Sequence, residues 1–506
     1  MQGEGRGRVR VSRFEPNCDP HPALRAALSQ GERAAFEFPV LDIRSLLIVL
    51  SALFLFSCPL LAAEENSVRL PPYSKVQLEN GMTLLLMEQH EVPLISFHII
   101  VKEAGSIVDG RGKEGLASLT ADLLRKGTST RTAEEISTEL DFIGGEFDMN
   151  ASQDFTSGSA EFLKKDIRVG VDLVADVILN PVFPPAEVTK LIEQRVNGIK
   201  SAKDRAETVI SRYFYKYLYG EAAYARPVNG DERSLADITR EDIQKFYAEN
   251  YIATNVTLAV AGDFATEEMR KLLEERFKAW PGGKWMVRDY APRPPVHGKR
   301  LLLVDKPDST QTYFYIGNFG ISRTYPDRVA IGLVNTLFGG RFTSRLNTAL
   351  RINSGLTYGA RSTFDQLRMQ GPFMIASYTR NETTEKALDM TLEVLSNFRE
   401  KGVTQTELDS ARAYLKGQFP PTIETTDRLA AMIAHLQFYG LDEAEINSYY
   451  AKLDAVTLAE ANQIIKQYFP VEDLVFVLIG KASEIQSTAK KYAPTVDVKT
   501  ITQPGF

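Results

Sequence analysis

The clearest pattern of apolar and polar positions lies at residues 115–128, where apolar side chains recur at helical spacing and Gly127 follows the last of them. A glycine directly after an apolar-faced segment is a helix stop signal, so we predict a helix that ends at Gly127. Two short apolar runs precede it, at 82–88 and 94–101, and Pro93 separates them. Runs of this length beside a chain breaker are typical of strands.

The rest of the first half of the chain mixes the two kinds of pattern. Helical spacing predicts helices at 132–142, 166–179 and 187–206, and residues 147–163 are typical of two strands with a polar interruption. Strands and helices follow one another without a strict strand–helix–strand alternation. The fold class is therefore predicted to be α+β rather than a doubly wound parallel sheet.

The second half repeats features of the first at a constant offset. Thr239 and Thr457 each stand where a helix N-cap is expected, and each is followed by a buried strand that ends in glycine, Gly262 or Gly480. The two threonines are 218 positions apart, and so are the two glycines. A shared offset with shared start and stop signals indicates duplication of a roughly 220-residue unit.

A segment rich in proline and glycine, residues 281–298, divides the chain into two stretches of similar length. We expect an N-terminal lobe over residues 68–280 and a C-terminal lobe over residues 299–490. Residues 281–298 would then be the linker between them.

The N-terminal region has the plan of a secretory signal peptide at residues 44–63, with Arg44, an uncharged apolar run and two small residues at its end. The run contains Pro59 and is short for a membrane span. Residues 1–43 form a polar lead that a signal peptide does not need, so we expect them to be absent from the mature protein. The expected location is secreted and periplasmic, with membrane contact only if a lipid is attached to Cys58.

Composition narrows the possible functions. Of the 506 residues, 44% are hydrophobic and 25% are charged, as in ordinary globular proteins. The net charge of −6 argues against a nucleic-acid partner, because phosphate binding needs concentrated lysine and arginine. The two cysteines, Cys18 and Cys58, both precede the expected mature chain. A disulfide framework, a thiolate metal site and a thiol nucleophile are therefore excluded there.

The segment around the predicted helix 115–128 resembles the pitrilysin/insulinase family of zinc metallopeptidases, the inverted zincins. The resemblance rests on Glu103-Ala-Gly-Ser-Ile before the helix, on Arg-Lys-Gly-Thr at its end, and on Leu78-Glu-Asn-Gly-Met-Thr, Gly144-Gly-Glu-Phe and Asn180-Pro-Val-Phe in family order. It spans about residues 70–490. It implies two homologous αβ-roll lobes, as in mitochondrial processing peptidase, with mixed, mainly antiparallel sheets flanked by helices.

In that family the helix carries H-x-x-E-H, in which two imidazoles bind zinc and the glutamate is the general base. The matching positions here hold Ser118, Ala121 and Asp122. The third ligand of the family, a glutamate, matches residues 197–199, where this chain has no carboxylate. One acid cannot hold zinc, and an alanine cannot take a proton from water. We therefore expect no metal in this chain and Zn²⁺ in a partner subunit.

The second lobe retains a family segment. The stretch Leu350-Arg-Ile-Asn-Ser-Gly-Leu-Thr-Tyr358 resembles the family's R-x6-Y segment, whose arginine and tyrosine reach the substrate backbone and the reacting carbonyl. Arg351 and Tyr358 hold these two positions. A guanidinium and a phenol are donors that can bind a peptide carbonyl. The structural alternative is an arginine at a helix end and a tyrosine in a strand packed on the core.

The resemblance, together with the missing ligands, predicts a non-catalytic, substrate-binding subunit of a heteromeric zinc metallopeptidase that is inactive alone. The expected partner is a zinc-bearing homologous subunit, in a heterodimer that encloses unfolded peptides. The alternative is a structural or peptide-binding scaffold with no role in proteolysis. An active enzyme that uses other residues is the weakest interpretation, because no Gly-x-Ser-x-Gly elbow or Ser/His/Asp ordering occurs.

Overall fold

The computed structural model describes residues 68–284, 290 and 295–506. The predicted polar lead 1–43, the signal peptide 44–63 with Cys58, and half of the linker 281–298 lie outside the described residues. Within the described residues, no helix is both long enough and apolar enough to cross a bilayer. Residues 68–506 belong to one compact unit, so the two halves of the chain pack together.

The first sheet has the strand order β1-β2-β6-β3-β5-β4. Its strands are β1 (Ser74–Gln77), β2 (Thr83–Glu88), β3 (Leu94–Lys102), β4 (Glu146–Ala151), β5 (Phe155–Leu163) and β6 (Val256–Gly262). β2 pairs parallel with β6, and the other neighbouring strands pair antiparallel. The strands predicted from the sequence at 82–88 and 94–101 are β2 and β3.

The second sheet repeats this arrangement, with the order β12-β7-β11-β8-β10-β9. Its strands are β7 (Lys299–Asp305), β8 (Gln311–Phe319), β9 (Ala360–Phe364), β10 (Pro372–Arg380), β11 (Leu474–Gly480) and β12 (Thr495–Thr500). β7 pairs parallel with β11 and β12, and the remaining pairs are antiparallel. The predicted α+β fold, with two similar lobes and mixed, mainly antiparallel sheets, is confirmed.

The predicted repeat also appears in the elements that precede the central strands. Thr239 caps α8 (Arg240–Asn250) and Thr457 caps α17 (Leu458–Tyr468), each by accepting a backbone N–H three residues further on. Each helix leads to a fully buried strand, β6 or β11, that ends in the predicted glycine. Gly262 has φ +145°, and a Cβ there would lie 2.2 Å from a carbonyl oxygen of β3, so only glycine fits.

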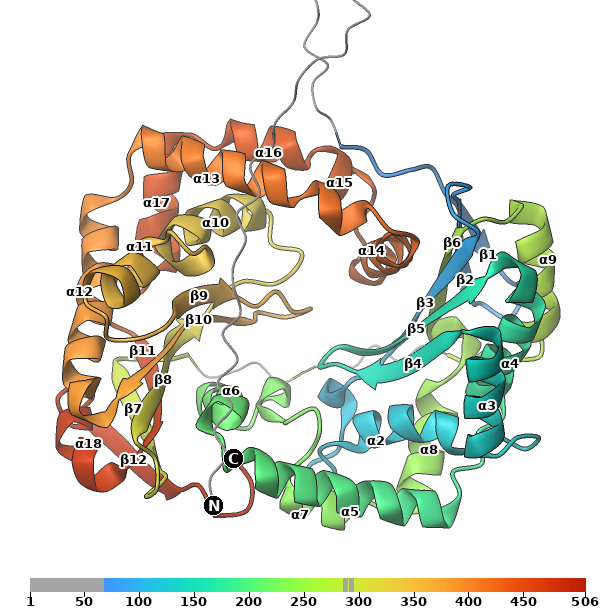
Figure 1. Cartoon of the computed structure of the whole chain (residues 1–506), viewed down its shortest axis with the longest axis horizontal. Coiled ribbons are helices and arrows are strands. Elements are labelled where there is room, and N and C mark those ends of the chain that lie inside the picture. Colours follow the sequence, from blue (N-terminus) through green and yellow to red (C-terminus); the bar gives the residue numbers. More distant parts are fainter. Residues whose placement is uncertain (1–67, 285–289, 291–294) are drawn as a thin grey trace, which may run out of the picture. The chain divides into compact units, whose positions relative to one another are not determined.

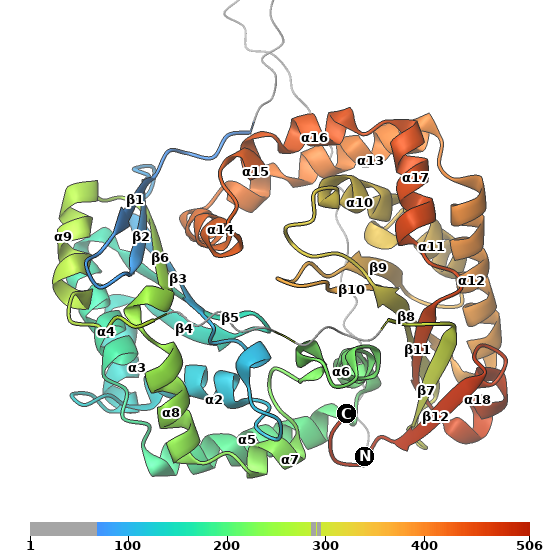
Figure 2. The same cartoon turned by 180° about the vertical axis from the view of Figure 1, so that it is seen from behind.

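Helices lie against both sheets, as Figure 1 and Figure 2 show. The remaining described α-helices are α2 (Leu116–Leu123), α3 (Ala133–Ile143), α4 (Ile167–Leu179), α5 (Pro185–Ala202), α6 (Ala206–Tyr219), α7 (Glu232–Ala236), α9 (Thr266–Phe277), α10 (Arg328–Asn335), α11 (Arg345–Asn347), α12 (Thr384–Lys401), α13 (Gln405–Gln418), α14 (Thr426–Tyr439), α15 (Ala444–Asn447), α16 (Tyr449–Ala455) and α18 (Ala482–Ala489). The predicted helices 132–142 and 166–179 are α3 and α4. The predicted helix 187–206 is α5, and the separate helix α6 was not predicted.

Two helices are exchanged between the halves of the chain. α6 follows the first-half helix α5 but packs on the second sheet, where Phe214 lies in one apolar core with Val477 of β11. α14 belongs to the second half but packs on the first sheet, where Ile433 lies in one core with Ile100 of β3. Figure 1 shows α14 beside β3. Each sheet is therefore covered on one face by a helix from the other half of the chain.

Candidate functional site

α2 presents the positions that match the family's metal motif. Gly115 precedes this helix with φ +97°, and a Cβ there would lie 2.8 Å from the backbone nitrogen of Gly230. The Asp109 carboxylate accepts the backbone N–H groups of Gly115 and Ala117, both at 2.9 Å, and so caps the start of the helix. Burial raises the pKa of Asp109 to about 8. Close backbone packing and a buried cap therefore hold this helix in place.

An arginine from α5 lies against the motif face of α2. Arg195 donates from Nη1 to Ser118 Oγ at 2.8 Å and from Nη2 to the Ser118 carbonyl oxygen at 3.2 Å, and it forms an ion pair with the Asp122 carboxylate. Ser118 Oγ in turn donates to Asn229 Oδ1 at 2.9 Å. The Arg195 side chain is 13% exposed and the Asp122 side chain 36%. A guanidinium thus contacts two of the three positions where the family motif has its imidazoles and general base.

The residues at these positions do not fit a zinc ion. Zinc takes imidazole, thiolate or carboxylate ligands, and of Ser118, Ala121 and Asp122 only the last offers one. The third-ligand region supplies Gly198, which lines the same cavity of about 480 Å³ as Ser118 and Asp122. A cation already paired with Asp122 repels a second cation. The part of the chain that the structure describes holds no group of three or more His, Cys, Asp or Glu side chains able to bind a metal.

Arg195 was not among the residues predicted from the sequence. The sequence comparison looked for a carboxylate at residues 197–199 and found none. Arg195 precedes Gly198 by three positions on α5, and residues at this spacing share a helix face. The signal that could have found it is a cation one turn from the third-ligand position, together with the acid Asp122 at a motif position.

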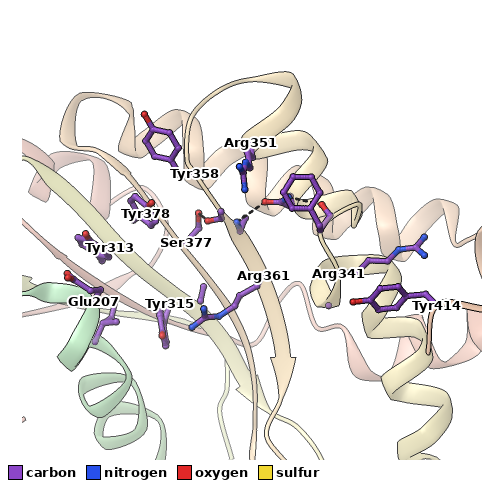
Figure 3. Close-up of a pocket in the computed structure, with 18 residues that line it drawn as sticks. Glu207, Tyr313, Tyr315, Arg341, Arg351, Tyr358, Arg361, Ser377, Tyr378 and Tyr414 are labelled. Carbon is purple, nitrogen blue, oxygen red and sulfur yellow. Dashed lines mark hydrogen bonds between the residues drawn. The ribbon is translucent and has the colours of Figure 1, made fainter. Parts of the chain in front are cut away.

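Arg351 and Tyr358 line a second cavity, of about 730 Å³, formed by α6, the strands β8, β9 and β10, and residues 339–361. Arg351 lies in a π-helical turn, Thr348–Asn353, and its guanidinium carbon is 4.8 Å from the centre of the Phe342 ring. Figure 3 shows Arg351 above Ser377 and Tyr358 at the rim, with the phenol directed outward. Tyr358 is 78% exposed, so it does not pack on the core.

Tyrosines from the second sheet form much of the wall of this cavity. Tyr313 of β8 and Tyr378 of β10 are paired in the sheet register, and their rings stack with centres 5.1 Å apart. Tyr315 lies two residues along β8 on the same face, because side chains alternate along a strand. Tyr414 of α13 lines the same cavity. Figure 3 shows these side chains around the opening.

The charged residues of the wall are mostly arginines. Arg341 donates to Ser410 Oγ at 3.1 Å, and its guanidinium carbon lies 5.9 Å from the centre of the Tyr414 ring. Arg361 projects from β9, and Glu207 reaches the cavity from α6. The sequence analysis singled out Arg351 and missed these others. Tyr313 and Tyr315 alternate along the sequence, and this alternation was the available signal for a strand with a shared tyrosine face.

The structure does not bring the two sets of predicted residues into one cavity. Ser118 and Asp122 line the smaller cavity, and Arg351 and Tyr358 line the larger one. α6 contributes to both, with Arg212 in the smaller cavity and Glu207 in the larger. The larger cavity has the chemistry to bind an extended peptide, because guanidinium and phenol groups donate to carbonyl and carboxylate oxygens.

Two family models match the chain. The model described as Insulinase (Peptidase family M16) matches residues 86–232, and the model described as Peptidase M16 inactive domain matches residues 237–415. An uncharacterized zinc protease of Mycobacterium leprae is 26% identical over 411 residues, which covers 80% of this chain and 91% of the relative. The uncharacterized zinc protease YmxG of Bacillus subtilis is 23% identical over 410 residues, with coverage of 81% and 98%.

Solved structures share the fold. A crystal structure of a peptidase M16 inactive domain from Pseudomonas fluorescens has a TM-score of 0.76 at 27% identity, and the match covers 81% of this chain and 98% of that one. A protease from Helicobacter pylori has a TM-score of 0.75 at 20% identity, with coverage of 81% and 100%. With the two family models, which together match more than half of the sequence, these similarities establish that the chain is an insulinase-like member of peptidase family M16.

Proposed function

We propose that this chain is a non-catalytic, substrate-binding subunit of a heteromeric zinc metallopeptidase. The observation that carries the proposal is the Arg195 guanidinium on the motif face of α2. That face offers no general base, because the position of the glutamate is Ala121, whose side chain is a buried methyl group. The names of the relatives and the insulinase-family match over residues 86–232 support a peptidase-family member, and the residues at the motif positions carry the inference that its own site lacks metal chemistry.

The catalytic Zn²⁺ would then belong to a homologous partner chain with an intact H-x-x-E-H, joined to this one as a heterodimer. This chain would supply Arg351 and Tyr358 to hold the substrate. β9 is the outer strand of the second sheet and carries Arg361 of the cavity wall, so we expect an unfolded peptide to bind along this wall. The expected signal peptide at 44–63 would direct the complex to the periplasm, and the complex would contact a membrane only if a lipid were attached to Cys58.

The alternative, a scaffold with no role in proteolysis, is less well supported by the larger cavity. Tyr358 is 78% exposed, and Arg351 contacts an aromatic ring rather than an acid. An exposed aromatic side chain and a cation without an acidic partner in one cavity are typical of a binding surface.

The test uses the mature chain and the zinc-bearing homologue encoded by the same organism. This chain alone should bind no stoichiometric zinc by elemental analysis and should cleave no unstructured peptide. Mixing the two chains should give cleavage, and Arg351→Ala or Tyr358→Phe in this chain should lower the rate about tenfold or more, as loss of a substrate donor does.

Arg380→Gln is the matched control, because Arg380 lies at the end of β10, pairs with Glu382 and does not line the cavity. It should leave the rate of the mixed chains unchanged. Hydrolysis by the isolated chain that a chelator abolishes would contradict the proposal. An unaffected rate in both site variants would leave the scaffold alternative.

A further inference from the structure

The larger cavity is basic in a chain that is acidic overall. Of the described residues that line it, Arg341, Arg351 and Arg361 are cationic and Glu207 is anionic, so three positive charges and one negative charge leave +2. The whole chain carries −6. The positive charge is therefore concentrated at this site and is not a consequence of composition.

Acidic side chains do not neutralise these arginines. Among the described residues, no carboxylate oxygen lies within 4.0 Å of their guanidinium nitrogens. Arg351 contacts the Phe342 ring, and Arg341 donates to a serine hydroxyl. Arg345 on the same segment shows the contrast, because its Nε and Nη2 hold Glu407 at 2.8–3.1 Å. Arg345 is therefore paired with an acid, whereas the described residues give none of the cavity arginines an acidic partner within 4.0 Å.

Arg361 is the most available of the three. It lies on β9 opposite Ala376 of β10, its side chain is exposed, and Figure 3 shows it directed toward Tyr315. The Asp365 carboxyl is close enough to Arg361 for the guanidinium to lower its pKa, but burial has the larger effect and raises that pKa. The Tyr215 hydroxyl also donates a hydrogen bond to Asp365, at 2.6 Å. Asp365 is therefore engaged on the core side and leaves the Arg361 guanidinium to a ligand.

The aromatic wall strengthens recognition of an anion. The phenols of Tyr315, Tyr358 and Tyr378 can each donate a hydrogen bond, and the stacked rings exclude water from one side of the cavity. Hydrogen bonds between a guanidinium and a carboxylate are stronger than neutral ones, and an arginine can make two at once. A basic ligand would meet the same arginines as like charges.

We propose that this cavity selects peptide segments that carry aspartate or glutamate side chains over neutral and basic segments. The inference rests on the proposed peptide-binding function and names the substrate class that the site prefers. A carboxylate of a peptide C-terminus has the same chemistry as an acidic side chain, so the two sources are separated in the test.

The test measures binding of the mature chain to fluorescent peptides by anisotropy. One unstructured, N-acetylated and C-amidated sequence is made with glutamate, glutamine or lysine at the same two positions, and the glutamine version is also made with a free C-terminal carboxylate. Each is measured with the native chain, with Arg361→Gln, and with the control Arg380→Gln. Circular dichroism checks the fold, which exposed substitutions should leave intact.

The glutamate peptide should bind about tenfold more tightly than the glutamine peptide at low salt, and the lysine peptide should bind most weakly. Raising the ionic strength should reduce the preference, because exposed charge pairs are screened. Arg361→Gln should lower affinity for the glutamate peptide several-fold and leave the glutamine peptide unchanged. A gain from the free C-terminus with no gain from the two glutamates would assign the site to terminal carboxylates and overturn the selection of side chains.

The outcomes separate this inference from the function on which it rests. Equal affinity for the glutamate, glutamine and lysine peptides, with no effect of Arg361→Gln, would overturn the charge preference and leave peptide binding standing. Binding of none of the peptides would overturn both. Tightest binding of the lysine peptide would overturn the preference and show that Glu207 dominates the cavity.

Discussion

At the scale of a single residue, Arg195 determines which chemistry the smaller cavity can support. Its guanidinium has three polar contacts on α2, two with Ser118 and one with Asp122. The permanent positive charge of Arg195 is therefore paired with Asp122, the one acid at the motif positions. The position keeps a cation, but it is one that cannot activate water.

We expect Arg195→Ala to lower the free energy of unfolding by about 1–2 kcal/mol, because Asp122 loses its counter-charge and Ser118 loses a donor. The value lies below that for a fully buried pair, since the Asp122 side chain is 36% exposed. Urea unfolding measures the change. Asp122→Ala in the same chain should cost less than it does alone, as expected for coupled residues.

Lys190→Ala on the same helix is the control, because Lys190 is well exposed and reaches Glu187 only at 3.5 Å. It should change the free energy of unfolding by less than about 0.5 kcal/mol. Equal effects of Arg195→Ala and Lys190→Ala would show that the contacts with α2 do not stabilise the protein.

Residues near one another in sequence were the predictable part of the site. Arg351 and Tyr358 are seven positions apart, and both line the larger cavity. Arg195 and Asp122 are 73 positions apart, and their contact depends on how α5 packs on α2. No local sequence pattern encodes that packing. The sequence therefore identified the degenerate motif positions but could not show that the Arg195 guanidinium lies against them.

At the scale of elements, α14 meets the first sheet through two histidines. The rings of His98 on β3 and His435 on α14 have centres 5.2 Å apart, and His98 Nε2 is buried without a hydrogen-bond partner among the described residues. Burial, with a smaller effect of the neighbouring His435, lowers the pKa of His98 to about 4, and burial also lowers the pKa of His435. Both rings are therefore neutral when α14 is docked at neutral pH.

We expect acid to weaken the folded state through His98. Its pKa is lower when folded than when unfolded, so stability is complete above about pH 6.5 and falls as the unfolded chain alone takes up a proton. The loss from His98 reaches about 3 kcal/mol near pH 4. His98→Phe should remove this part of the loss, as measured by urea unfolding at about pH 7 and about pH 4.5.

His90→Gln provides the opposite case. His90 is exposed, and its hydrogen bond with Asp263 raises its pKa, so protonation of this ring favours the folded state. Replacing His90 should not reduce the loss of stability that the protein shows in acid. If His98→Phe and the native chain lose equal stability in acid, the histidine pair is not the source of the pH dependence.

Helix caps and strand ends were predictable because they depend on neighbouring residues. Thr239, Thr457, Gly262 and Gly480 all stand where the repeat placed them. The exchange of α6 and α14 was not predictable in this way. An amphipathic helix has an apolar face whichever sheet covers it, so its sequence does not say which sheet that is.

At the scale of the whole described chain, the exchange makes the two sheets depend on each other. The C-terminal residues add a further link, because Lys203 in the first half pairs with Glu232 at 2.6 Å and donates to the Gln503 carbonyl oxygen at 2.8 Å. Arg368 in the second half donates its backbone N–H to Asp154 of the first at 2.8 Å. We therefore expect residues 68–506 to unfold in one transition.

Phe214→Ala on α6 tests this dependence. Phe214 is fully buried in the core over the second sheet, so its loss should cost about 3–5 kcal/mol. The buried Trp280 belongs to the core over the first sheet. Trp285→Phe leaves Trp280 as the single tryptophan, and its fluorescence should then report the same shifted unfolding midpoint as circular dichroism. Phe142→Ala is the control, because the Phe142 side chain is 90% exposed, and it should shift neither midpoint. The opposite result is a Trp280 transition that stays at the midpoint of the native chain while circular dichroism shows two steps. It would show that the two sheets unfold separately and that the exchanged helices do not couple their stability.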